Sequence, residues 1–164
     1  MSDDNLVQRA LSYAELCKIT LDLATPLGHG TDGSVWRSSR ETAVKALKLE
    51  HNYHIELTCY QRLAAAGVVK LLRFAVPQLI GSNDDLLVIE MRIVTAPYVL
   101  DFAKAYLDER PDFSAEKWEA WREECEERFD EHWPEVQTLI WVLQKYGIYY
   151  YDAKPANIRI AGDD

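Results

Sequence analysis

Hydrophobic and polar positions along the chain change their spacing several times, and each spacing predicts a different element. Apolar residues three and four positions apart predict helices over residues 6–19, 51–66, 114–131 and 133–147. Apolar and polar residues in alternation predict strands over residues 20–27, 34–37, 42–49, 77–80, 86–92 and 158–160. Short turns at 38–41 and 81–85 join neighbouring strands, which favours antiparallel pairing.

The order of these elements predicts an α+β protein in two parts. Residues 1–92 are expected to hold an N-terminal helix and a five-stranded antiparallel sheet, crossed by one helix that ends at Gly67. Residues 93–164 are expected to form a reduced part that is helical up to residue 147. A chain of 164 residues with 48% hydrophobic composition is long enough for two small lobes around a shared cleft.

Composition and charge narrow the classes of function. The formal net charge is -9, whereas a protein that binds nucleic acid without sequence preference needs a basic face. Cys17, Cys59 and Cys125 are isolated, which indicates neither a disulfide framework nor a zinc site. The first ten residues lack the apolar core of a secretory signal, and no apolar run reaches the length of a membrane span. We therefore expect a cytoplasmic protein that binds neither nucleic acid nor membranes.

Residues 108–131 carry most of the negative charge, with eleven Asp and Glu against four Lys and Arg. Along the predicted helix 114–131, one face gathers Trp118, Trp121, Cys125 and Phe129. One interpretation is that this aromatic face packs inside the protein while the acidic face is solvated. The alternative is that helix 114–131 is an acidic docking surface for a basic protein partner.

A glycine loop lies at GHGTDGSV, where Gly28, Gly30 and Gly33 follow the spacing G-x-G-x-x-G. Backbone N–H groups in such a loop can approach phosphate oxygens closely, because no Cβ intervenes. A dinucleotide-binding loop would open a helix, but here a strand follows, which disfavours an oxidoreductase of that type. A hairpin turn without a ligand remains an alternative, and His29 is either an exposed loop residue or a phosphate contact.

Lys45 lies on the next predicted strand, where its side chain would enter the cleft under the glycine loop. A buried ammonium needs a negative partner. Glu56 on the following helix is suitable, whereas Glu50 follows Lys45 too soon. The alternative is an ordinary exposed strand lysine.

With these residues the chain resembles the protein kinases, whose signature joins a G-x-G-x-x-G-x-V loop, a V-A-I-K strand and a Glu on the crossing helix. The resemblance implies that Val35 and Ala43 enclose the adenine of ATP. It also implies that Lys45 holds the α- and β-phosphates, that Glu56 orients Lys45, and that a hinge lies at 90–92. The cofactor-binding residues that follow from it are Gly28, Gly30, Gly33, Val35, Ala43, Lys45, Glu56, Glu90 and Met91.

A second kinase-like motif lies in YYYDAKPANIRI near the end of the sequence. Asp152 and Asn157 are spaced as in the catalytic loop H-R-D-x-x-x-x-N, with Lys154 between them, while Tyr150 and Tyr151 replace the His and Arg. The resemblance implies that Asp152 accepts a proton from the substrate hydroxyl and that Lys154 neutralises the γ-phosphate. It implies further that Asn157 is an oxygen ligand of Mg²⁺. An ordinary polar loop in which Asp152 caps a turn is the alternative.

The chain departs from the kinase pattern after this loop. It shows no D-F-G, whose aspartate is the chief metal ligand of a kinase, no activation segment and no A-P-E. Asp163 or Asp164 could replace that ligand, so Asp164 joins Asn157 as a candidate for the metal site. The resemblance therefore implies a truncated, minimal kinase-like protein that spans residues 20–160 and lacks most of the kinase C-terminal lobe.

Two functions follow from these motifs. The first is a minimal kinase-like phosphotransferase that binds ATP and Mg²⁺, with Lys45, Asp152 and Lys154 as its catalytic residues. The second is a pseudokinase-like binding module that acts through a partner protein.

Overall fold

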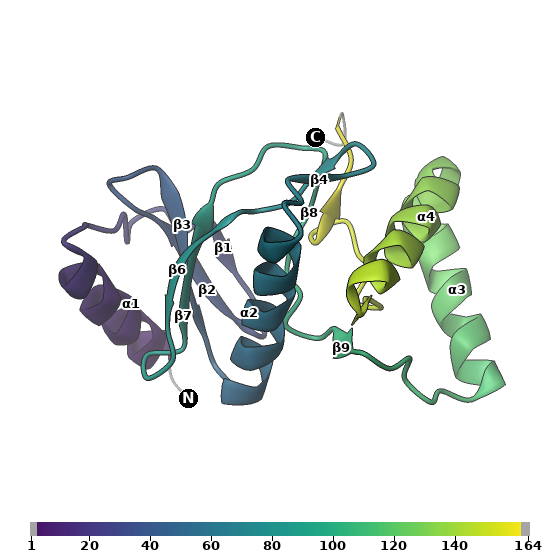
Figure 1. Cartoon of the computed structure of the whole chain (residues 1–164), viewed down its shortest axis with the longest axis horizontal. Coiled ribbons are helices and arrows are strands. Elements are labelled where there is room, and N and C mark those ends of the chain that lie inside the picture. The colour runs from purple at the N-terminus through teal and green to yellow at the C-terminus, as the bar shows by residue number, and fades with distance from the viewer. Residues whose placement is uncertain (1–2, 162–164) are drawn as a thin grey trace.

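The computed structural model describes residues 3–161, which form an α+β fold around an antiparallel sheet of five strands. In spatial order the strands are β1 (Gly28–His29), β2 (Gly33–Arg37), β3 (Thr42–Leu47), β7 (Val88–Arg92) and β6 (Leu79–Asn83). Helix α1 (Asp3–Cys17) covers one face of this sheet and α2 (Glu50–Ala65) covers the other (Figure 1). The α+β class and the antiparallel sheet predicted from the sequence are confirmed.

Strand β3 is buried on both faces because its side chains alternate between two hydrophobic clusters. Val44 and Ala46 pack with residues of α1. Ala43 and Leu47 belong to the larger cluster, which holds α2 and the second half of the chain. Since side chains alternate along a strand, Lys45 is directed to the same side as Ala43 and Leu47.

The strand predicted over residues 20–27 is wrong, because the segment forms only an isolated bridge from Leu21 to Ser38 and single backbone hydrogen bonds from Asp22 and Leu27 to β2. The carboxylate of Asp22 accepts hydrogen bonds from the backbone N–H of Ala24 at 3.0 Å and from the hydroxyl of Thr25 at 2.8 Å. These bonds fold the chain into a turn that interrupts the strand. Regular pairing therefore begins only at β1.

The helical expectation for residues 93–113 is also wrong. The segment carries β8 (Tyr98–Val99) and β9 (Tyr106–Leu107). A second sheet has the order β11 (Ile158–Arg159), β8, β5 (Phe74–Ala75) and β4 (Lys70–Leu71), and β9 pairs with β10 (Ile148–Tyr149). Pro97 and Pro111 lack the N–H that a helix interior needs, and Asp101 and Asp108 have left-handed φ angles of 64° and 67°. A continuous helix is therefore impossible here.

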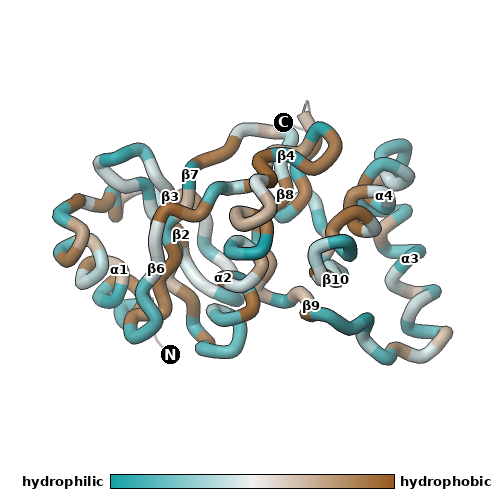
Figure 2. The backbone as a smooth tube through the Cα atoms, in the orientation of Figure 1, coloured by the Kyte–Doolittle hydropathy of each residue, from teal (hydrophilic) through white to brown (hydrophobic). Residues whose placement is uncertain are grey.

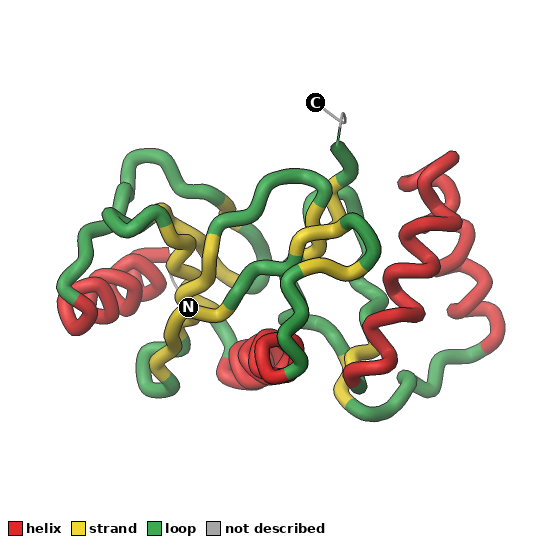
Figure 3. The backbone as a smooth tube through the Cα atoms, turned by 45° about the horizontal axis from the view of Figure 1, so that its top comes forward, coloured by secondary structure: helices red, strands yellow, loops and turns green. Residues whose placement is uncertain are grey.

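Helices α3 (Ala115–Phe129) and α4 (Trp133–Leu143) lie side by side next to the second sheet (Figure 3). Short 3₁₀ turns follow them, η1 (Asp130–His132) and η2 (Gln144–Tyr146). Cys125 and Phe129 are buried, and Trp121 donates its ring N–H to the carbonyl of Tyr151 at 2.8 Å, so the aromatic face of α3 packs inward. Most residues of α3 are hydrophilic (Figure 2). No helix within residues 3–161 is long and apolar enough to cross a membrane.

Candidate functional site

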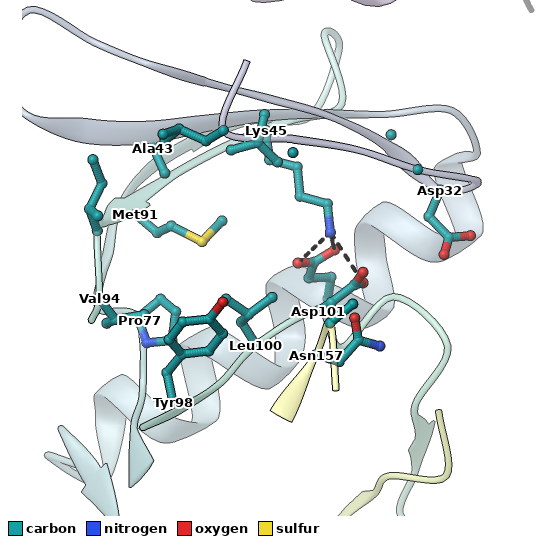
Figure 4. A pocket seen from close by; sticks show the side chains of 18 of the residues that line it. Asp32, Ala43, Lys45, Pro77, Met91, Val94, Tyr98, Leu100, Asp101 and Asn157 are labelled. Atoms are coloured by element: carbon teal, nitrogen blue, oxygen red, sulfur yellow. Dashed lines mark hydrogen bonds and ion pairs between the residues drawn. The ribbon is translucent and has the colours of Figure 1, made fainter. Parts of the chain in front are cut away.

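A cavity of about 460 Å³ lies between the five-stranded sheet and the segments that carry β8 and β11 (Figure 4). Its two ends differ in chemistry. Apolar side chains such as Ala43 and Met91 line one end, and Lys45, Asp101 and Asn157 line the other. The residues predicted from the sequence that line it are Gly28, Gly30, Gly33, Val35, Ala43, Lys45, Glu56, Met91, Lys154 and Asn157.

Two of the site residues predicted from the sequence, Glu90 and Asp152, are not among those that line the cavity. Glu90 is 1% exposed and accepts hydrogen bonds from the hydroxyls of Tyr13, at 2.9 Å, and of Thr42. Its side chain holds α1 to the sheet and does not reach the cavity. The Asp152 carboxylate accepts a hydrogen bond from the Asn157 amide and lies 3.4 Å from the Lys154 ammonium. Asp164 lies outside the described residues.

The glycine loop is an antiparallel hairpin, with Gly28 of β1 opposite Val35 of β2. The backbone N–H of Gly30 donates to the carbonyl of Gly33 at 3.0 Å and closes the turn. A Cβ added at Gly33 would lie 2.2 Å from the carbonyl oxygen of Ala46, so only glycine fits there. A strand follows the loop, whereas a dinucleotide-binding loop needs a helix at this point, and that alternative is excluded.

Lys45 and Glu56 form a buried ion pair at the polar end of the cavity. The Lys45 ammonium donates to both carboxylate oxygens of Glu56, at 2.9 Å and 2.7 Å, and the two side chains are 8% and 1% exposed. It also donates to Asp101 at 3.2 Å, so one ammonium serves two carboxylates. The exposed-lysine alternative is therefore wrong.

Burial and the excess of negative charge set the pKa values of Lys45 and Glu56. Burial raises the pKa of Glu56 to about 7 despite the attraction of Lys45, and the charge of Asp101 adds to the rise. Burial opposes the charged form of Lys45, but the two carboxylates outweigh it and raise the pKa of Lys45. The ammonium therefore stays charged, and Glu56 is the group whose protonation changes near neutral pH.

Asp101 is a site residue that the sequence analysis misses, and strand pairing brings it to the cavity. It follows β8, which pairs antiparallel with β11 so that Val99 lies opposite Ile158. The backbone N–H of Leu100 donates to the carbonyl of Asn157 at 2.9 Å. Asp101 and Asn157 therefore lie side by side, and the Asn157 side chain is directed toward Asp101 (Figure 4).

The sequence does contain a signal for this residue. Asp101 and Phe102 match the first two residues of a D-F-G, but they precede the loop at 152–157, whereas the D-F-G of a kinase follows its catalytic loop. Phe102 is fully buried, with its ring centroid 5.2 Å from that of Tyr60 and 5.5 Å from that of Tyr150. This packing fixes the position of the adjacent carboxylate.

The residues of the terminal motif are tied to one another. The Asn157 amide donates to the carbonyl of Asp152 at 2.9 Å and to its carboxylate at 3.2 Å. The Lys154 ammonium lies 3.4 Å from the same carboxylate, whose side chain is 25% exposed. Arg128 of α3 donates to the carbonyl of Ala153 at 3.3 Å, so α3 braces this loop from outside. The motif is therefore an ordered loop at the edge of the cavity.

Asp101 and Asn157 are the residues that could hold Mg²⁺ in this site. Both offer side-chain oxygens, the ligand type that Mg²⁺ prefers, and they are neighbours across a strand pair. Within residues 3–161 no group of three or more His, Cys, Asp and Glu gathers into a metal cluster. A magnesium ion here would complete its coordination with water or with oxygens of a bound phosphate, as it usually does.

Comparisons with known proteins find similarity among solved structures. No protein-family model matches the chain, and no curated protein matches it. Among solved structures, the chain is similar to the ternary complex of streptomycin, ATP and APH(2'')-IIa, with 16% identity and a TM-score of 0.41 over 77% of this chain and 38% of that one. It is similar to the ADP-bound aminoglycoside phosphotransferase APH(2'')-Ib, with 17% identity and a TM-score of 0.41 over 75% of this chain and 39% of that one. The chain thus spans well under half the length of either protein.

Proposed function

We propose that this protein is a minimal kinase-like phosphotransferase that binds ATP with Mg²⁺ and transfers the terminal phosphate to an acceptor hydroxyl. One observation carries the proposal: a single cavity is lined by the glycine hairpin, the Lys45–Glu56 ion pair and the neighbouring oxygen donors Asp101 and Asn157. Its volume of about 460 Å³ falls within the usual range of small-molecule sites.

The two chemically different ends of the cavity match the two ends of a nucleotide. The adenine would lie in the apolar end, between Val35 and Ala43 of the sheet and Leu100 on the opposite wall. The phosphates would lie under the glycine hairpin, where Gly28 and Gly30 leave room for a close approach to the backbone, and would reach the ammonium of Lys45. Glu56 holds that ammonium in place.

The transfer step needs a base, a cation near the terminal phosphate and a metal. Asp152 would accept the proton of the acceptor hydroxyl while the acceptor oxygen bonds to the γ-phosphorus. The bond from that phosphorus to the β–γ bridging oxygen then breaks, and ADP leaves with the electron pair. Lys154 would neutralise charge on the transferred group. Asp101 and Asn157 would hold Mg²⁺, which when bound neutralises charge on the phosphate oxygens.

This assignment changes one part of the sequence-based picture. Asp101 takes the metal-binding role that the sequence analysis gave to Asp164. In the proposal, residues 1–92 supply the hairpin, Lys45 and Glu56, and residues 93–164 supply both metal donors and the loop of Asp152.

A specific contact also favours a second function, nucleotide binding without transfer. The Asp152 carboxylate is bonded to the Asn157 amide and lies 3.4 Å from Lys154, and Asp152 does not line the cavity. If Asp152 also stays outside the cavity when ATP is bound, it does not reach the acceptor hydroxyl and cannot act as a base. The chain would then be a pseudokinase-like module that acts through a protein partner, for example at the acidic face of residues 114–131.

Melting temperature and phosphate release separate these functions. A ligand that binds only the native state raises the melting temperature, so ATP with Mg²⁺ should raise that of the wild type but not that of Lys45→Met. Lys48→Met is the matched control, because Lys48 lies one residue beyond β3 and outside the cavity lining. Binding accompanied by release or transfer of labelled γ-phosphate supports the enzyme, and binding alone supports the module. A wild type that shows no shift overturns both.

A further inference from the structure

A lysine that is not among the site residues predicted from the sequence contacts the glycine hairpin from the opposite side of the cavity. The Lys104 ammonium lies 3.2 Å from the Asp32 carboxylate and donates to the Thr31 hydroxyl at 3.4 Å. Thr31 and Asp32 both lie in the hairpin and line the cavity. Lys104 is in the segment that follows Asp101, so this ion pair joins the two walls at the polar end.

The two members of this pair are buried to different degrees. The Asp32 side chain is 11% exposed and accepts a hydrogen bond from the Asn52 amide at 3.0 Å, whereas the Lys104 side chain is 43% exposed. A carboxylate that is nearly out of water needs a cation, because burial without a partner is costly. The lysine has the freedom to change partners, since much of it stays in solvent.

Carboxylates of three segments act on the charge of Lys104. Partial burial works to lower the pKa of Lys104, but the Asp32 carboxylate outweighs this and raises it, helped by the charges of Asp152 and Asp101. These carboxylates belong to the hairpin, the terminal loop and the end of β8. Lys104 therefore stays charged beside the glycine hairpin.

Building on the proposed function, we propose that Lys104 is a phosphate-binding residue that is paired with Asp32 until ATP binds. When ATP binds, its terminal phosphate replaces the Asp32 carboxylate as the partner of the Lys104 ammonium. Both partners present negatively charged oxygens, and the phosphate carries the larger charge, so it competes with Asp32 for the ammonium. Asp32 keeps the hydrogen bond from the Asn52 amide after the exchange. The two lysines that line the cavity, Lys45 and Lys154, are paired with Glu56 and Asp152, whereas Lys104 lies outside the lining and reaches it through Thr31 and Asp32.

Breaking the ion pair from each side in turn tests this exchange. Replacing Lys104 removes a phosphate contact, so Lys104→Gln should weaken ATP binding by about tenfold. Replacing Asp32 frees the lysine, so Asp32→Asn should strengthen ATP binding by up to about threefold. Asn at position 32 keeps the shape and the acceptor for Asn52, which protects the fold. Binding of ADP, which lacks the terminal phosphate, should change by less than about twofold in either variant.

Calorimetric titration with ATP and with ADP, in the presence of Mg²⁺, gives the result directly. Lys104→Arg should restore ATP affinity, and Lys70→Gln, which removes an exposed lysine outside the cavity lining, should leave it unchanged. If ATP affinity changes in the same direction in Lys104→Gln and Asp32→Asn, the ion pair serves only to hold the two walls together, and the inference is overturned. No change in either variant would overturn it too. If the wild type binds no ATP, the proposed function itself fails.

Discussion

The backbone N–H of Leu100 donates to the carbonyl oxygen of Asn157 at 2.9 Å. This bond places the next residue, Asp101, beside Asn157, although the two belong to distant parts of the chain. The arrangement supplies two oxygen donors at the end of the cavity where Lys45 and Glu56 are already paired.

We expect magnesium to strengthen ATP binding through Asp101. In the wild type, Mg²⁺ should raise ATP affinity by about tenfold or more, because the metal neutralises phosphate charge near a carboxylate-rich wall. In Asp101→Asn this gain should largely disappear. Asparagine is the right replacement, since Asp101 has a φ of 64°, and Asn tolerates this left-handed conformation. Calorimetric titration with ATP in Mg²⁺ or in chelator measures the gain.

The control for this variant is Asp85→Asn, in the exposed turn between β6 and β7. It should keep the full magnesium effect. An undiminished magnesium effect in Asp101→Asn would show that the metal is held elsewhere.

The buried pair predicts a pH dependence of stability. Folded Glu56 keeps its proton up to a pKa of about 7, against a usual value of 4.5, so between these values the folded state binds more protons than the unfolded state. Its contribution to stability is therefore complete below pH 4.5 and is lost as the pH rises through about 7. Relative to Glu56→Gln, the wild type should lose about 2 kcal/mol across this range.

Urea unfolding at about pH 5 and about pH 8 measures this difference. Glu50→Gln, at the exposed start of the same helix, should follow the wild type. Parallel pH profiles for the wild type and Glu56→Gln would contradict the assignment.

Asp152 should matter for transfer and not for nucleotide binding. Asp152→Asn is expected to slow release or transfer of γ-phosphate by at least about 100-fold, because it removes the proposed base. ATP affinity should change little, since Asp152 does not line the cavity. Single-turnover measurements with labelled ATP report the first quantity, and titration reports the second. Equal rates in the wild type and the variant would remove Asp152 from the mechanism.

Glu90 should matter for stability and not for the nucleotide. Glu90→Ala leaves the hydroxyls of Tyr13 and Thr42 without their acceptor and should cost about 2–4 kcal/mol of unfolding free energy. Tyr13→Phe, which removes one of the two bonds, should cost about 1 kcal/mol. ATP affinity of the folded fraction should stay within about twofold. A selective loss of ATP binding in a stable Glu90→Ala protein would mean that the Glu90 side chain belongs to the nucleotide site after all.

The sequence predicts best those parts of the fold that combine a strong period with a local turn. Strand β3, helix α2 and the glycine hairpin follow from such patterns, and so does the meeting of Lys45 with Glu56. The face of Glu90 could also have been predicted, because Met91 and Glu90 are consecutive in a strand and so point to opposite faces. Once Met91 is directed to the cavity, Glu90 is directed to α1.

The rest depends on contacts between distant segments. Strands β8 and β11 have two residues each, which is too short for a period to be visible. Their pairing, and with it the placement of Asp101, is decided by long-range hydrogen bonds and by the burial of Phe102. The spacing of residues along the chain cannot predict such a pairing. The order of the kinase motifs does not predict it either, because the D-F-G of a kinase follows its catalytic loop.

The pairing of β8 with β11 also decides when, during synthesis of the chain, the polar end of the cavity can form. Synthesis delivers Lys45 and then Asp101 well before Asn157, at about 5–20 residues per second. Until β11 has left the ribosome, β8 has no antiparallel neighbour on that side, and the nascent chain holds two carboxylates and a lysine without the amide. A newly made chain can therefore assemble the polar end of the cavity only after the segment at 157–159 has docked.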